Sequence, residues 1–336
     1  MNDKMTFKKK QKLTIAVVLV SYNQEKYILQ ALEGIQSQTR KPDEVVIADD
    51  GSSDSTQQRI HEFIERNGLR SKWVLLFSNI NRGININFQN AVDHTTSEII
   101  IPMAGDDISL PNRCADTEKL FLRYPGFLLI ALSGYLINDK GDILRQVTRS
   151  DRIVRGVAGA IRRGNPKITP MAQAMRREIM YQYGILPHDL PNEDDQISFR
   201  GLISGGIVCS SIKAVKYRIH ADSASAWLHR QQSREVFLDR FKKDLLIRER
   251  HMRYWSMCLQ HSKLRNKDTL ADMANLKADF YKHLCMVDRL SFLKRLKLAI
   301  EFLKIISFKD AVYCLFGSHG IFASKTFRYY RNFISC

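Results

Sequence analysis

The first hundred residues alternate between continuous apolar runs and amphipathic segments. Residues 13–20, LTIAVVLV, are β-branched or apolar throughout, which is the pattern of a strand buried on both faces. In the next segment, the apolar side chains at positions 28, 31, 32 and 35 fall on one face of a helix. Three further strand-like runs, EVVIADD, WVLLFS and EIIIPM, each follow a helical pattern. This alternation predicts right-handed βαβ units, a mostly parallel sheet flanked by helices, and hence an α/β fold.

Local signals mark the ends of several of these elements. The second helical segment opens with Ser55 and Gln58 at the spacing of a capping box, and it stops at Gly68. Pro102 lies inside the fourth strand-like run. Because proline has no main-chain N–H to donate, we expect that strand to end or bend there.

The last third of the chain differs in composition and charge. From about residue 226 onward there is no proline, and long stretches rich in Leu, Lys and Arg predict helices. The formal net charge of the 336 residues is +17; 22 Lys and Arg against 10 Asp and Glu place +12 of it between Arg230 and Cys336. Such a surface would attract nucleic acid, an anionic membrane or phosphorylated substrates.

Three interpretations of this basic region stay open. It packs on the rest of the chain or on a second copy, it contacts an anionic membrane, or it binds RNA. We expect no nucleic acid partner, because the basic residues are not interleaved with the stacking aromatics of a single-strand binder.

Cysteine usage and the lack of long apolar runs indicate a compartment. The six cysteines are scattered and include no C-x-x-C pair, which argues against the usual zinc spacings and a disulfide framework. No run approaches the roughly 18 to 20 apolar residues of a transmembrane helix. Residues 1–12 are interpreted as a basic, solvated tail rather than a signal peptide. We therefore expect a cytoplasmic protein.

Polar residues follow three of the predicted strands, in SYN, DDGSSDS and AGDDIS. The carboxyl ends of parallel strands meet at one edge of a sheet, where such folds bind ligands. Asp49 and Asp50 are typical of an acidic turn or cap, or of a site that accepts hydrogen bonds from a nucleobase or ribose. Asp106 and Asp107 are either solvated loop acids or ligands of a hard cation such as Mg²⁺ or Mn²⁺ that carries a diphosphate.

A third acidic cluster stands in PNEDDQISFR, residues 191–200. Acids at the start of a helix are stabilised by its dipole, so capping is one interpretation and a general base is the other. Neither G-x-G-x-x-G nor G-x-x-x-x-G-K-[ST] is present, which excludes the usual dinucleotide and P-loop sites.

Taken in order, VVLVSYNQEKYI, EVVIADDGSSDST, SEIIIPMAGDDISLPNR, NEDDQISFR and YRIHADSAS strongly resemble the family 2 glycosyltransferases of the GT-A fold. The resemblance covers roughly residues 13–225 and extends to bacterial enzymes of surface polysaccharide such as O-antigen. It implies a Rossmann-like GT-A domain over 13–225 between the tail (1–12) and a basic, mostly helical C-terminal region (226–336).

The resemblance also implies roles for individual residues. Tyr22 matches a position that packs against the nucleotide base, Asp50 one that hydrogen-bonds the base, and Asp49 supports the turn. Asp106 matches the D-x-D region that contacts the ribose and diphosphate. Arg82 is a further nucleotide contact, without a gapless match.

The metal and the catalytic base are assigned in the same way. Asp107 and His220 are the expected ligands of a divalent metal, Mg²⁺ or Mn²⁺. Asp194, six residues before Arg200, matches the general base, with Asp195 as the less favoured neighbour. Ala104 replaces the first acid of D-x-D, a departure that bears on metal affinity.

The activity implied is an inverting transfer of a sugar from a nucleoside-diphosphate sugar to a hydroxyl of a glycan acceptor, with the acceptor lipid-linked and the enzyme peripheral at the inner face of the cell membrane. The rival from another class is a catalytically silent relative that binds nucleotide sugars or acts as a scaffold in polysaccharide assembly.

Overall fold

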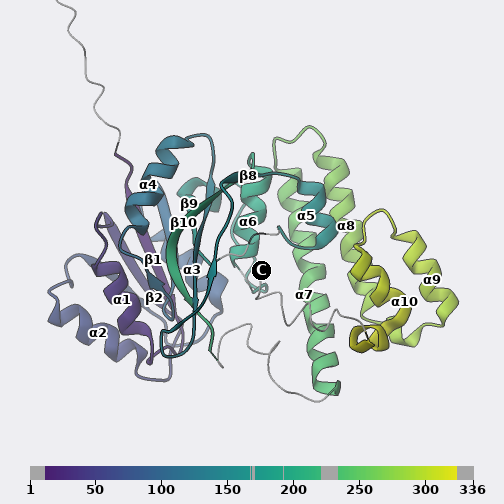
Figure 1. Cartoon of the computed structure of the whole chain (residues 1–336), viewed down its shortest axis with the longest axis horizontal. Coiled ribbons are helices and arrows are strands. Elements are labelled where there is room, and N and C mark those ends of the chain that lie inside the picture. The colour runs from purple at the N-terminus through teal and green to yellow at the C-terminus, as the bar shows by residue number, and fades with distance from the viewer. Residues whose placement is uncertain (1–11, 167, 169–170, 192, 221–233, 324–336) are drawn as a thin grey trace, which may run out of the picture.

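The computed structural model describes residues 12–166, 168, 171–191, 193–220 and 234–323. In these residues ten strands form one sheet in the order β3-β2-β1-β4-β9-β6-β10-β5, with β7 beside β6 and β8 beside β10. Helices cover both faces, and further helices extend from one side of the sheet (Figure 1). The expected α/β fold with a helical C-terminal region is confirmed.

The elements have the following bounds. The strands are β1 (Ile15–Ser21), β2 (Glu44–Asp49), β3 (Trp73–Phe77), β4 (Ile99–Ala104), β5 (Ile108–Ser109), β6 (Leu129–Ile137), β7 (Ile143–Val147), β8 (Arg152–Val154), β9 (Gln173–Arg176) and β10 (Ile207–Arg218). The helices are α1 (Ile28–Gln36), α2 (Thr56–Arg66), α3 (Ile84–Asp93), α4 (Arg113–Arg123), α5 (Val157–Arg163), α6 (Glu193–Ile203), α7 (Arg234–Gln260), α8 (Lys267–Leu284), α9 (Phe292–Glu301) and α10 (Phe308–Ala323), with 3₁₀ turns η1 (Arg177–Met180) and η3 (Val287–Arg289).

The half of the sheet built first along the chain is parallel, as the sequence predicts. β1 pairs with β2 and β4, and β2 pairs with β3, all in parallel register. All seven residues of β1 are buried, because α1, α2 and α4 cover one face and α3 covers the other. The second half is mixed: β6 and β10 are parallel, whereas β9 runs antiparallel between β4 and β6.

Two boundary predictions need correction and one is confirmed. Ser55 precedes α2 but its side chain makes no capping hydrogen bond; Asp54 Oδ1 instead accepts from the Thr56 N–H at 3.0 Å. β4 continues past Pro102. The Pro102 carbonyl accepts a hydrogen bond from Arg113, so the main chain of this residue faces away from β1. On that other side the pairing of β4 with β9 stops at Ile100, and the missing proline N–H therefore breaks no ladder bond. Gly68, with φ of 61°, follows the end of α2 as expected.

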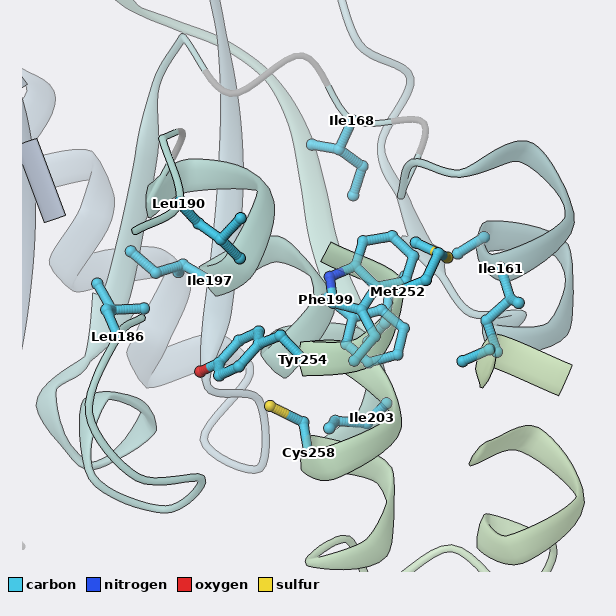
Figure 2. Close-up of a cluster of buried hydrophobic side chains, with 14 of the residues drawn as sticks. Ile161, Ile168, Leu186, Leu190, Ile197, Phe199, Ile203, Met252, Tyr254 and Cys258 are labelled. Carbon is cyan, nitrogen blue, oxygen red and sulfur yellow. The ribbon is translucent and has the colours of Figure 1, made fainter. Parts of the chain in front are cut away.

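The C-terminal helices share a hydrophobic core with one face of the sheet. α7 lies against α6 and α8, and Phe199 of α6 stacks on Trp255 of α7 with 3.9 Å between ring centroids. Side chains from α5, α6 and α7 meet in the same cluster (Figure 2). This region therefore packs on the α/β domain. The expected boundary between residues 225 and 226, like most of the tail over 1–12, lies outside the described residues.

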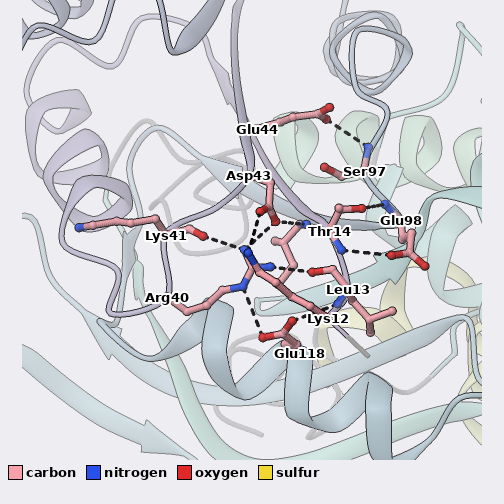
Figure 3. Close-up of polar contacts among 11 residues, drawn as sticks. Lys12, Leu13, Thr14, Arg40, Lys41, Asp43, Glu44, Ser97, Glu98 and Glu118 are labelled. Carbon is pink, nitrogen blue, oxygen red and sulfur yellow. Dashed lines mark hydrogen bonds and ion pairs between the residues drawn. The ribbon is translucent and has the colours of Figure 1, made fainter. Parts of the chain in front are cut away.

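A polar network fixes the amino-terminal ends of the strands. Asp43 Oδ2 accepts the Ile15 N–H at 2.8 Å and pairs with Arg40 at the same distance, while Arg40 also donates to the Leu13 carbonyl. Glu118 accepts the N–H of Leu13 and Glu98 accepts that of Thr14, the two residues before β1 (Figure 3). Asp43, Glu98 and Glu118 therefore each accept a main-chain N–H at or just before the first residue of β1.

The cysteines and the apolar character of the helices bear on the expectations about disulfides and membrane spans. The five cysteines found there are all free thiols. Among the described helices, none combines the length and apolar character required to cross a bilayer.

Candidate active site

Asp49 lies at the end of β2 and organises the turn after it. Its two oxygens accept hydrogen bonds from the Ser21 hydroxyl (2.7 Å), the N–H and hydroxyl of Ser52 (2.8 and 2.6 Å), and the Gln57 amide (2.7 Å). The residue is fully buried. Asp49 therefore supports the turn, and its side chain joins the ends of β1 and β2.

Asp50 holds a second loop beside this turn. One carboxylate oxygen accepts the Arg82 N–H at 2.9 Å and the other accepts the Gly83 N–H at 2.8 Å. Gly51 makes the close approach possible: its φ is 74°, and a Cβ there would lie 2.7 Å from the carbonyl carbon of Ile80. The structure thus brings Arg82 next to Asp50 through its main chain, with the Arg82 side chain exposed.

The loop after β1 forms one wall of a cavity of about 200 Å³. Tyr22 is 45% exposed at this edge, and Asn23, with φ of 52°, hydrogen-bonds the turn after β2 through both its N–H and its side chain. The cavity is lined by Asn23, Gln24, Glu25, Lys26, Tyr27, Asp54 and His220. Tyr22 itself is not among the lining residues, but it precedes Asn23, and an exposed aromatic ring can stack on a planar base.

Asp106 and His220 meet across the sheet edge. Asp106 Oδ2 lies 3.0 Å from His220 Nε2, and the imidazole ring packs against Tyr27 with 4.8 Å between centroids. A carboxylate and an imidazole are both ligands for divalent metals. The structure therefore unites two residues that the sequence places 114 positions apart.

Asp107 lies deeper than its neighbour. It is 6% exposed, and its Oδ1 accepts the Arg218 N–H at 2.9 Å. Burial, together with the negative charge of Asp106, raises the pKa of Asp107 well above its usual range, although Arg218 and Arg113 oppose the shift. The paired acids thus contact different groups, His220 at Asp106 and the buried Arg218 at Asp107.

Arg218 connects the acidic loop to its surroundings. Its side chain is almost fully buried, donates to the main-chain oxygens of Asp106, Asn138 and Asp139, and lies 4.6 Å above the ring of Tyr27. Sequence analysis does not single out Arg218, although it stands two residues before His220 in the quoted YRIHADSAS segment.

The third acidic cluster begins α6. Burial raises the pKa of Asp194 well above its usual range, and the negative charges of Glu193 and Asp195 add to the shift. Burial likewise raises the pKa of Glu193 to about 7 and that of Asp195 to about 6. The charges of Arg248, which lowers the pKa of Asp195, and of Asp244, which raises it, both come from α7, so this carboxylate lies within electrostatic range of that helix.

Tyr217 of β10 shows that the two acidic clusters are neighbours. Its pKa is raised first by burial and then by the negative charges of Asp107, Asp106, Asp194 and Glu193. A charge affects a titratable group in this way only at short range. The loop after β4 and the start of α6 therefore face the same region of the sheet.

Arg200, six residues after Asp194, has its hydrogen-bond partners in other segments. The fully buried guanidinium donates to the carbonyls of Ile179, Met180 and Gly184 and to the Tyr254 hydroxyl. Arg200 therefore joins the segment after β9 to α6 and α7 and has a structural role.

The donor set fits a metal that receives its remaining ligands from substrate. The described residues contain no group of three or more His, Cys, Asp and Glu side chains that would enclose an ion by themselves. Asp106 and His220, whose side chains are 15% and 8% exposed, could supply two ligands, and Mg²⁺ in particular is commonly held by one or two carboxylates plus phosphate oxygens. Such an arrangement fits a metal–diphosphate pair rather than a closed structural site.

Comparison with solved structures identifies the architecture. The S. aureus TarS 1–349 structure in complex with UDP-GlcNAc aligns with 90% of this chain and 82% of its own, at 16% identity and a TM-score of 0.56. The mannosyltransferase PcManGT from Pyrobaculum calidifontis, in complex with GDP-Man and Mn²⁺, aligns with 96% and 85% of the two chains at 16% identity and a TM-score of 0.51. These similarities confirm the GT-A fold expected from the sequence.

Sequence comparison identifies the family. The uncharacterized protein Rv1520 of Mycobacterium tuberculosis is 38% identical over 113 residues, which are 33% of this chain and 32% of the relative, so the chain spans about a third of that protein's length. The family model described as glycosyl transferase family 2 matches residues 16–192, more than half of the chain, from β1 to the segment before α6. The chain therefore belongs to glycosyl transferase family 2.

Proposed function

We propose that this protein transfers a sugar from a nucleoside-diphosphate sugar to an acceptor hydroxyl, with inversion at the anomeric carbon. The observation that carries the proposal is the 3.0 Å contact between Asp106 and His220, which lines a cavity together with Asp54 of the turn that Asp49 holds. The charges of Asp106 and Asp194 both raise the pKa of Tyr217, which supports their proximity. Family membership and the donors bound by TarS and PcManGT support the same substrate class.

The donor half of the site consists of residues at the strand ends. Tyr22 packs on the base, Asp50 accepts its N–H groups, and Arg82 lies beside Asp50 to contact the nucleotide. Both Asp50 oxygens already accept one main-chain N–H each, and a carboxylate has about four acceptor positions, so capacity remains for a ligand. Asp49 acts indirectly by fixing the turn.

The divalent metal is assigned to Asp106 and His220, in place of Asp107. Asp106 is the more exposed acid and already contacts the imidazole, whereas Asp107 is buried with one oxygen bonded to Arg218. A bound Mg²⁺ or Mn²⁺ supplies charge stabilisation to the leaving diphosphate. Asp107 then supports the loop from behind.

Asp194 is the proposed general base. Its raised pKa gives the carboxylate the proton affinity that an acceptor hydroxyl requires, and the charge of Glu193 helps to maintain it. Asp195 is less suitable because it faces Arg248 and Asp244 of α7. The base takes the proton of the hydroxyl while its oxygen attacks the anomeric carbon and the nucleoside diphosphate departs.

The family resemblance and the charge of the chain support a proposal for the acceptor and for the location of the protein. The resemblance to surface polysaccharide enzymes supports a glycan acceptor carried on a lipid, and the excess of +12 in the last third supports a peripheral position at the inner face of the cell membrane.

A donor screen tests the proposal. Thermal shift with UDP-, GDP- and dTDP-sugars is measured with and without Mn²⁺ or Mg²⁺, for the wild type, Asp106→Ala and Asp194→Asn. We expect stabilisation by one nucleotide with metal, lost in Asp106→Ala and retained in Asp194→Asn. Donor binding without any turnover in the presence of glycan acceptors would favour a silent relative, and no response to any donor would overturn the donor site.

A further inference from the structure

The apolar side chains of α9 and the turn after it form two separate groups. Leu298, Ala299 and Phe302 are buried against the neighbouring helices. The other group is solvent-exposed in the described structure, with exposed fractions from 38% to 76%. It consists of Phe292, Leu293, Leu296, Ile300 and Leu303, which we call the α9 apolar face.

Helical geometry places this second group on one continuous stripe. At roughly 100° per residue, the four members within α9 share a sector about 100° wide, and the buried Leu298 and Ala299 occupy a separate sector. Leu293 is 76% exposed and Ile300 is 63% exposed, so the stripe is open to solvent and not only partly covered. A helix that turns one apolar face inward and another outward has a second apolar partner.

Charged side chains border the α9 apolar face. Lys294, Lys297 and Lys304 are all exposed. On α9, Lys297 and Lys294 follow the apolar stripe around the helix, and Lys304 lies in the turn after it. Arg295 is different, because its guanidinium donates to the main-chain oxygens of Leu290 and Asp288. The order around the helix is therefore buried, apolar and charged, and the charged sector holds the exposed Glu301 between Lys297 and Lys294.

The α9 helix lies at the periphery of the described structure. In Figure 1, α9 lies at the end of the molecule opposite α2, with α10 between it and α7. α10 packs on α9 and on η3, which supports the helix from within.

We propose that the α9 apolar face inserts into the headgroup–acyl boundary of an anionic lipid surface while Lys294, Lys297 and Lys304 contact the lipid phosphates. An apolar stripe beside a row of lysines is the pattern of a helix that lies in the plane of a membrane. A second copy of the chain suits this face less well, because packing two such helices together brings like-charged lysine rows into proximity. The inference rests on the membrane location within the proposed function and not on sugar transfer itself.

Vesicle co-sedimentation tests the proposal on the full chain. Wild type is expected to bind vesicles that contain phosphatidylglycerol, and to bind neutral phosphatidylcholine vesicles far more weakly. Leu293→Ser/Ile300→Ser and Lys294→Glu/Lys297→Glu are each expected to weaken binding to the anionic vesicles about tenfold or more. Both pairs are exposed, so folding should be retained, which circular dichroism checks.

Matched controls separate this face from general charge and hydrophobicity. Lys72→Glu/Lys140→Glu changes the net charge by the same amount as Lys294→Glu/Lys297→Glu, at exposed positions far from α9 in the sequence. Met257→Ser removes an apolar side chain that is 59% exposed on α7. Both control variants should bind vesicles like wild type.

Equal loss of vesicle binding in the controls, or unaltered binding of both α9 variants, would overturn the proposal. A dimer in light scattering that Leu293→Ser/Ile300→Ser dissociates, without vesicle binding by wild type, would assign the face to a second copy. Donor binding in solution is measured in parallel and is expected to be the same in all variants, so a failure of the lipid proposal is distinguishable from a failure of the donor site.

Discussion

The two edges of the sheet both carry acidic side chains, but the surroundings of these acids differ. At the amino-terminal edge, burial raises the pKa of Asp43, yet the Ile15 N–H and Arg40 outweigh it and the net shift is downward. The pKa of Glu44 is likewise lowered, because hydrogen bonds from Thr96 and Ser97 exceed the effect of its burial.

At the edge where the strands end, the balance is reversed. Burial and neighbouring negative charges raise the pKa of Asp107, and at the start of α6 they raise that of Asp194. Acids that hold a fold together are stabilised as anions, whereas acids whose charge is left partly uncompensated have affinity for a proton, a metal or a substrate. The direction of the pKa shift therefore distinguishes Asp43 and Glu44 at one edge from Asp107 and Asp194 at the other.

The strongest test of this contrast is Asp194→Asn. The amide cannot accept the proton of the acceptor, so kcat is expected to fall roughly 10² to 10⁴-fold while donor affinity stays the same. Steady-state kinetics and calorimetric titration of the donor measure the two effects. Asp195→Asn is the matched control, with a loss below about tenfold in kcat. Weaker donor binding with normal turnover in Asp194→Asn would place this residue in the donor half instead.

Arg218→Met tests how the functional edge is held in place. The variant removes the donors to Asp106, Asn138 and Asp139 from a buried position, and the free energy of unfolding is expected to fall by roughly 3 to 5 kcal/mol. Urea denaturation measures the change. A loss below 1 kcal/mol would mean that water replaces the guanidinium and that the acidic loop is held by other groups.

Removing one acid from each edge in turn tests the difference between the two edges. Asp106→Ala is expected to weaken metal-dependent donor binding roughly 10- to 100-fold, because one of the two proposed ligands is lost. Glu98→Ala removes an acid from the opposite edge and should leave donor affinity unaltered. Titration of the donor at fixed Mn²⁺ measures both. Equal loss in the two variants would show that the edges do not differ in function.

The pH dependence of activity reports on Asp194. The base acts only when ionised, so kcat/KM should fall as the pH drops through its raised pKa. Glu193→Gln removes a negative charge that raises this pKa, and the acidic limb is expected to move to lower pH, by up to about one unit. A limb that moves to higher pH, or does not move, would contradict the assignment.

The smallest effect is expected at the structural edge. Asp43→Asn should lower the free energy of unfolding by about 1 kcal/mol or less at neutral pH, with donor binding intact. Because the folded-state pKa of Asp43 is lowered, its stabilisation is present above the ordinary pKa of about 3.9 and is lost as the pH falls through the folded-state value. Wild type and variant should therefore converge in acid unfolding, and a difference that grows below pH 4 would be inconsistent with this role.

Much of the α/β domain could be predicted from the sequence because its signals are local. The apolar run over residues 13–20 and the helical pattern after it correspond to β1 and α1, and the order of strands and helices up to β4 is as expected. Polar residues after buried parallel strands also predict where Asp49, Asp50 and Asp106 gather. These inferences need only periodicity, strand direction and connection length.

The strand pairing in the mixed half of the sheet could not be predicted from such local signals. β9 lies between β4 and β6 although it is more than 60 residues from the one and more than 30 from the other along the chain. Short antiparallel strands of this kind are fixed by long-range pairing, which leaves no periodic trace. Pro102 shows the same limit: its effect on the strand depends on where the pairing with β9 ends, and only the sheet determines that.

By itself the sequence determined the fold class, the family and the edge where the acidic residues collect. Only the tertiary structure decided how these acids divide their roles. Asp106 meets His220 and Asp107 turns inward to Arg218 because β10 returns beside β5, a contact between segments more than 100 residues apart. Burial, charge and pKa are properties of the surroundings of a side chain, and those surroundings exist only once distant segments have packed together.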